Sequence, residues 1–417
     1  MFLSKKLTNE ERKNARNYLS YYTVLSIFSS LCALPIIQAF LLSYGFSNQH
    51  LGLINTTIII AAVMGALLVM GVMDTFKQEK IILLNSLLCY CHFILPMVLI
   101  GLGWFTDRYS LLALMIIITA WSLFNFLNGA RNIAEQKISR SLIRSQNYGF
   151  IFGLCGLILS VIGVVGGFAA KAILDLLDER YRYELIFFIS MIFIPFVIYY
   201  TRQFRVLEHS DFNKASTTYQ KRNPWEAFIA SLQIETLKFA TWVHVIRGIF
   251  NSVAFFALPI GVQFYNLPLN DAPYVAIIFA ISGIAGNYMI FVIYDRIGTV
   301  NTTLIATLTA IIAFICLFFT RDSFMYLIFI SLFIFAYSVI NWSIPLGVYK
   351  ITPNHLVSAY TGVRVVVMQS SEALFSFLIG LILLQLALQY LLTAMIVLFL
   401  VFMWAVFKAF HQEDFVQ

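Results

Sequence analysis

Long apolar segments alternate with short polar ones along almost the whole chain. Each apolar segment is about as long as the roughly 20 residues that an α-helix needs to cross a bilayer. They are far too long for the strands of a membrane β-barrel, and only helices and closed barrels satisfy the backbone in lipid. The pattern predicts an all-α membrane protein with twelve transmembrane helices, at 18–44, 51–73, 81–105, 110–134, 148–174, 184–202, 239–265, 273–294, 301–320, 324–349, 357–385 and 387–409.

The composition supports this prediction. Of the 417 residues, 60% are hydrophobic and only 11% are charged, whereas a soluble globular chain is typically about 45–50% apolar and about 25% charged. The chain would have too little polar surface to stay dissolved. We therefore expect the lipid bilayer to be its solvent over most of its length.

Lysine and arginine are distributed unevenly between the loops that connect the predicted helices. If the N-terminus is cytoplasmic, the cytoplasmic segments carry 19 of these residues and the opposite segments carry 5. Cytoplasmic loops of membrane proteins carry an excess of positive charge. We therefore expect both termini to be cytoplasmic and the protein to lie in the cell membrane. The net charge of +7 follows from this bias, so it does not indicate binding to nucleic acid.

One long polar segment divides the chain into two similar parts. Residues 203–237 separate the first six predicted spans from the last six, whereas every other loop is short. Two six-helix halves joined in this way are typical of secondary transporters. We expect a cytoplasmic leader at 1–17, an N-terminal half at 18–202, a cytoplasmic loop at 203–237, a C-terminal half at 238–410 and a cytoplasmic tail at 411–417.

The loop after the second predicted span of each half carries an aspartate. In the second half the loop is YDRIGTVN, residues 294–301, and in the first half it is MDTFKQEK, residues 73–80. Asp74 and Asp295 occupy equivalent places. A repeat of this kind agrees with two halves of related structure.

These loops resemble the signature loop of the major facilitator superfamily, Gly-x-x-x-Asp-Arg-x-Gly-Arg-Arg. The second half matches at its Asp, Arg and second Gly, while Phe291 stands in place of the leading glycine. The first half keeps the aspartate and a nearby lysine, and Met70 replaces its leading glycine. The resemblance implies the major facilitator fold, with two pseudo-symmetric six-helix halves. It also implies a gating role for four residues, Asp74, Asp295, Arg296 and Gly298.

A second resemblance lies in the fourth and fifth predicted spans. The fourth contains NFLNGARN, residues 125–132, which is similar to a glycine-rich family pattern with Asn125 in place of an arginine. The fifth contains YGFIFGLCGLILSVIGVVGG, residues 148–167, which resembles the glycine pattern of proton antiporters without its Gly-Pro pair. The partial match favours export by antiport, and the missing proline leaves uptake by symport open.

Few ionisable residues lie within the predicted spans, and each is a candidate functional residue because a charge in hydrocarbon is costly. The fourth span places its polar residues in an arc of about 120° when they are drawn at 3.6 residues per turn. Spans one, seven and ten carry similar polar faces. In the family these four spans line the central cavity, so the resemblance implies that their polar residues bind the substrate. The candidates are Tyr22, Ser26, Asn125, Asn128, Arg131, His244, Arg247, Asn251, Asn341 and Trp342, with Arg364 from the eleventh span.

Positive charge is in excess among these residues, because three arginines are set against two glutamates. Arginine is the usual side chain for recognition of a carboxylate or phosphate. We therefore expect a small organic anion as the substrate. The alternative is that Arg131 and Arg364 belong to a gate, where they would pair with Asp74 and Glu135.

Glu372 lies near the middle of the eleventh predicted span. A lone carboxylate in apolar surroundings exchanges protons readily, which suits proton coupling. Arg364 is not its partner, because eight residues place it about 12 Å away along a helix. Glu135 is the second candidate for proton coupling.

No sequence pattern indicates an enzyme. The chain has no Walker loop, no zinc-protease motif and no set of metal ligands. We therefore expect a monomeric secondary transporter that moves a small organic solute by alternating access, driven by a proton gradient and without a cofactor. The alternatives are an efflux pump for amphipathic drugs or lipids, and proton-coupled uptake of a neutral nutrient such as a sugar.

Overall fold

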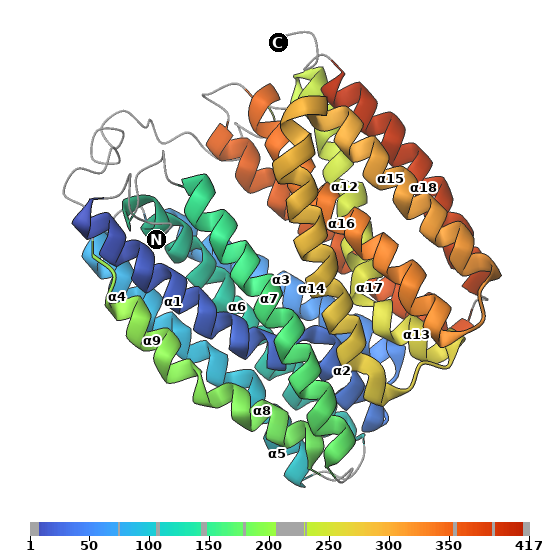
Figure 1. Cartoon of the computed structure of the whole chain (residues 1–417), viewed down its shortest axis with the longest axis horizontal. Helices are drawn as coiled ribbons and strands as arrows, with labels where there is room; N and C mark the ends of the chain where they lie inside the picture. The colour runs from blue at the N-terminus through green and yellow to red at the C-terminus, as the bar shows by residue number, and fades with distance from the viewer. Residues whose placement is uncertain are drawn as a thin grey trace. The chain divides into compact units, whose positions relative to one another are not determined.

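The computed structural model describes residues 8–73, 76–105, 109–142, 148–177, 181–205, 229, 232–352, 357–385 and 388–411. These residues are almost entirely helical (Figure 1). Within them, 11 helical stretches are long and apolar enough to cross a membrane, and a bent helix pair raises the number to 12. The predicted all-α membrane fold is therefore confirmed.

Each predicted span overlaps one helix or a pair of helices in the structure. In chain order they are α1 (Asn9–Leu31), α2 (Leu34–Ser43), α3 (Asn48–Met73), α4 (Gln78–Leu88), α5 (Ile94–Phe105), α6 (Leu111–Leu142), α7 (Tyr148–Leu176), α8 (Arg182–Ile192), α9 (Ile194–Arg202), α12 (Glu235–Phe255), α13 (Ala257–Tyr265), α14 (Ala272–Met289), α15 (Asp295–Phe319), α16 (Ser323–Ile351), α17 (Val357–Gln385) and α18 (Leu388–Phe410).

Several predicted spans are broken into two helices, and proline lies close to the breaks. Pro35 is in the first turn of α2 and Pro195 is in the first turn of α9. Pro259 lies just after the bend of 52° between α12 and α13. Proline lacks the backbone N–H and clashes with the preceding turn, so a helix tends to end ahead of it. A 3-10 segment, Cys89–Phe93, separates α4 from α5.

The first helix begins earlier than its apolar pattern predicts. The predicted span starts at residue 18, but α1 starts at Asn9. Its start is a capping box, in which the Thr8 hydroxyl accepts a hydrogen bond from the Glu11 N–H and the Glu11 carboxylate accepts one from the Thr8 N–H. Such a box satisfies two backbone groups that a helix start otherwise leaves unpaired.

Asn14 explains why this polar turn is nevertheless held in place. Its amide nitrogen donates to the carbonyl of Leu142 at 3.2 Å and to that of Arg205 at 2.7 Å. Its oxygen accepts a hydrogen bond from the Arg205 N–H. Asn14 is fully buried, and it ties α1 to the last residue of α6 and to the chain just after α9.

The chain divides into two compact units. The first comprises Met1–Gly45 and Thr57–Gln220, and the second comprises Phe46–Thr56 and Lys221–Gln417. In the first unit α1 packs along α7 and α9, and α4 packs along α6. In the second unit α12 packs along α17 and α18, and α15 packs along α16 and α18 (Figure 1). The first turns of α3 thus belong to the second unit.

Candidate functional site

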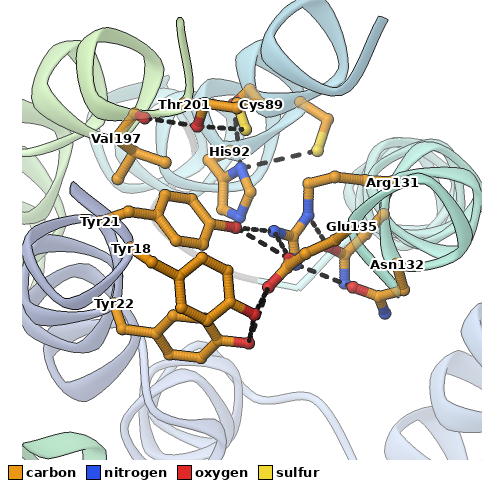
Figure 2. Close-up of polar contacts among 12 residues, drawn as sticks. Tyr18, Tyr21, Tyr22, Cys89, His92, Arg131, Asn132, Glu135, Val197 and Thr201 are labelled. Atoms are coloured by element: carbon orange, nitrogen blue, oxygen red, sulfur yellow. Dashed lines mark hydrogen bonds and ion pairs between the residues drawn. The ribbon is translucent and has the colours of Figure 1, made fainter. Parts of the chain in front are cut away.

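A buried ion pair lies at the centre of the polar residues in the first unit. Arg131 and Glu135 are one turn apart on α6, and their charged groups are 2.8 Å apart. The hydroxyl groups of three tyrosines from α1 point at Glu135 (Figure 2). Tyr22 donates to the carboxylate at 2.7 Å, Tyr21 at 2.9 Å and Tyr18 at 3.4 Å. The three tyrosines reach one group because residues three and four apart share a helix face.

Every nitrogen of the Arg131 guanidinium donates a hydrogen bond. Its Nε donates to the Asn128 oxygen at 2.9 Å, and one terminal nitrogen donates to the Asn132 oxygen at 2.8 Å. The other terminal nitrogen donates to Glu135 and to the Tyr21 hydroxyl. The charge of Arg131 is therefore compensated within α6, by a carboxylate on the same helix.

Two further candidate residues of the first unit donate side-chain hydrogen bonds to backbone carbonyls of their own helix. Asn125 donates to the carbonyl of Trp121 at 2.9 Å, and Ser26 donates to that of Tyr22 at 2.5 Å. Neither joins the hydrogen bonds around Arg131 in the structure.

A second polar cluster lies in the second unit, on α12 and α16. His244 and Arg247 share one face of α12, and a terminal nitrogen of Arg247 is 3.1 Å from His244 Nδ1. The other terminal nitrogen donates to the Asn341 side-chain oxygen at 2.7 Å. Arg364 of α17 is close enough to interact electrostatically with both His244 and Arg247.

Arg247 differs from Arg131 in its charge environment. Among the residues that the structure describes, no carboxylate forms an ion pair with Arg247. The Nε of Arg247 and the Nε2 of His244 are buried without a hydrogen-bond partner there. Buried polar groups are normally paired, so an unpaired set of this kind calls for a ligand or water.

Glu372 of α17 lies beside this cluster. Its carboxylate accepts a hydrogen bond from the Asn251 amide at 2.8 Å, and its backbone carbonyl accepts one from the Ser252 hydroxyl at 2.8 Å. Glu372 also interacts electrostatically with Arg247. Glu372 thus accepts a single side-chain hydrogen bond among the described residues, whereas Glu135 accepts four.

Gly248 brings α12 and α17 together at this point. A Cβ atom at Gly248 would overlap the Met368 carbonyl and the Ser371 hydroxyl, and it would lie 2.9 Å from the Glu372 nitrogen. The absent side chain therefore sets the distance between the two helices. It places Asn251, one turn further along α12, within reach of Glu372.

We expect Gly248→Ala to destabilise the protein, because a methyl group there meets backbone atoms that cannot move independently. Overpacking of this kind costs about 1–3 kcal/mol. The thermal unfolding midpoint of the purified protein in detergent measures the effect. Gly101→Ala is the matched control, because a Cβ there has open space around it. Equal midpoints for the two variants would show that the close approach is not needed.

The remaining predicted residues are placed as follows. Trp342 is exposed, at 53% of its surface. Gly298 has φ 76° and ψ 179°, a backbone conformation that favours glycine. A π-helical turn at Ile290–Tyr294 precedes Gly298 and ends next to Asp295. Arg296 is exposed. Asp74 lies outside the described residues. The proposed gating roles stay predictions.

Sequence reasoning did not select Tyr18, Tyr21, Asn132 or Tyr337 as site residues. Tyr337 is hydrogen-bonded to Asn341 one turn away on α16. The tyrosines had a visible signal, since NYLSYY repeats tyrosine at three- and four-residue spacing at the start of a span. What the pattern could not show was that their hydroxyls converge on Glu135.

Comparisons with known proteins agree with this fold. The family model that matches is that of the Major Facilitator Superfamily, over residues 19–376. No curated protein sequence matches the chain. A crystal structure of a mutant of the nucleoside transporter NupG is similar, with a TM-score of 0.70 and 13% identity, over 96% of this chain and 100% of that chain.

A second similar structure is that of a bacterial homolog to the human lysosomal transporter Spinster, in an inward-facing and unoccupied conformation. Its TM-score is 0.62 and its identity is 14%, over 90% of this chain and 83% of that chain. At such low identities, both likenesses concern the fold alone.

Proposed function

The chain belongs to the major facilitator superfamily, and from this we propose that it carries a small organic anion across the cell membrane by alternating access, coupled to protons. The family consists of transporters and not enzymes, so the protein is a multi-pass membrane transporter of a small molecule. The nature of the solute and the driving force are the parts that we propose.

The observation that carries the proposal is the contrast between two buried arginines. Arg131 has its charge compensated by Glu135 at 2.8 Å. Arg247 has no such counter-ion among the described residues, and its charge lies near that of Arg364. A buried cation such as Arg247 is costly unless an anion pairs with it. An anionic group of the substrate bound at Arg247 would supply that charge.

Glu372 is the proposed proton carrier. Four donors surround the Glu135 carboxylate, and Glu135 is the counter-ion of the buried Arg131. The Glu372 carboxylate accepts one side-chain hydrogen bond, so a change in its charge disturbs fewer hydrogen bonds than the same change at Glu135. Glu135 is therefore better suited to a structural role than to proton transfer.

A neutral, hydroxylated solute is the second candidate substrate. The compensated charge of Arg131 and the tyrosine hydroxyls beside it give the first unit a polar but neutral set of groups. For either substrate we propose cytoplasmic termini and a monomer. The direction of transport is proposed as export, from the glycine pattern of the fifth predicted span.

The function is tested by flux in proteoliposomes under an imposed pH gradient. We expect wild-type protein to accumulate an organic anion against its concentration gradient. Glu372→Gln is expected to keep exchange of the anion between equal pools while losing accumulation, because the amide cannot release a proton. A variant that still accumulates the anion with the pH gradient would exclude Glu372 as the proton carrier.

A further inference from the structure

The guanidinium of Arg131 fixes the orientation of two asparagine side chains. An arginine side chain only donates hydrogen bonds, so each asparagine must turn its oxygen toward Arg131. Asn128 does so at 2.9 Å and Asn132 at 2.8 Å. The NH2 group of each amide consequently points away from the guanidinium.

We propose that Asn128 and Asn132 form a pair of N–H donors that recognises a carbonyl oxygen, or a similar uncharged acceptor, on the substrate. The proposal rests on the proposed function in taking this face of α6 as part of the transport site. Arg131 is then a positioning residue, which orients the amides and does not bind the substrate itself.

The two amides are available for this role. They are four residues apart on α6, so their Cβ atoms lie about 5–6 Å apart on one face. Asn132 is exposed and Asn128 is partly exposed. Neither NH2 group donates a hydrogen bond to another residue in the described part of the chain. Asn125 differs, because its NH2 group donates to the Trp121 carbonyl.

The ion pair keeps the donors in place before a ligand arrives. Arg131 is held by Glu135 and by the Tyr21 hydroxyl, and both are buried (Figure 2). Donors that are already oriented need no ordering when the ligand binds, which favours affinity. A single carbonyl oxygen has two lone pairs, so it can accept a hydrogen bond from each amide.

Four probes of matched shape separate this inference from the proposed function. They are 4-acetylbenzoate, 4-isopropylbenzoate and the two corresponding benzamides. The acetyl and isopropyl groups have similar size, but only the acetyl group carries an acceptor. Binding of each probe to the purified full chain in detergent is measured by calorimetric titration. We expect the acetyl compound to bind about 2- to 10-fold more tightly per hydrogen bond than its isopropyl partner, in the acids and in the amides alike.

Substitution of the asparagines gives the decisive comparison. Asn128→Asp and Asn132→Asp keep an oxygen on Arg131 but replace the NH2 donor by a second acceptor. We expect each variant to lose the preference for the acetyl group, most clearly in the uncharged benzamide pair. Asn301→Asp is the matched control, because Asn301 is exposed on α15 and its amide donates to the Ile297 carbonyl.

Each outcome decides one of the two proposals. Equal binding of acetyl and isopropyl probes to wild type, no binding of any probe, or a preference that survives in both aspartate variants would overturn the donor pair. Equal binding of acids and amides with an intact acetyl preference would count against the anionic substrate and leave the donor pair standing.

Discussion

Replacing Arg247 with alanine is expected to lower kcat/KM for transport of an organic anion by about 10- to 100-fold. This fold-change corresponds to the loss of one charge-assisted hydrogen bond. The variant removes a buried cation that forms no ion pair with a carboxylate among the described residues. Transport of an uncharged amide analogue of the same solute should change much less. Initial rates in proteoliposomes at matched protein content measure both.

Two further variants make this result specific. Arg247→Lys keeps the charge but loses the planar fork that binds a carboxylate with two parallel hydrogen bonds, so we expect an intermediate loss. Arg12→Ala removes an arginine from an exposed position on α1 and should leave transport unchanged. Equal losses for the anion and its amide in Arg247→Ala would contradict anion binding at this residue.

Replacing Glu135 with leucine is expected to be the most destabilising change in the first unit. It leaves the buried Arg131 charge without a counter-ion, which typically costs about 3–5 kcal/mol. It also removes the acceptor of three tyrosine hydroxyls from α1. The thermal unfolding midpoint and the yield of monodisperse protein in detergent measure the effect.

The double variant Arg131→Met with Glu135→Leu is the control for this prediction. Replacing both partners of a buried ion pair with apolar residues is often neutral or stabilising, so the double variant should recover much of the lost stability. A double variant no more stable than Glu135→Leu would mean that the tyrosine hydrogen bonds, and not the unpaired charge, account for the loss.

The spans could be predicted from the sequence because lipid imposes a simple rule on length and polarity. The rule fails to predict a helix end where polar side chains pack that end against the rest of the protein. The start of α1 is such a case, since Asn14 is buried by hydrogen bonds to Leu142 and Arg205 that no local pattern reveals. The breaks at Pro35 and Pro195 were readable in principle, because proline disfavours a continuous helix.

The polar faces of single helices could also be predicted, since angular position depends only on residue spacing. The partners across helices could not. The spacing placed Arg131 and Glu135 on one face of α6, but not the α1 tyrosines that surround Glu135. Nor did it show that Gly248 lets α12 approach α17, which brings Asn251 to Glu372. Such contacts depend on which helices become neighbours.

The position of Asn14 has a practical consequence for anyone who shortens or tags the protein. The hydropathy pattern suggests residue 17 as a convenient point for trimming or for a fusion partner. Cutting there would remove the capped first turn at Thr8 and Glu11 together with Asn14, which holds α6 and the chain after α9. A cleavable tag is better joined ahead of Thr8, so that the capping box and Asn14 stay in the chain.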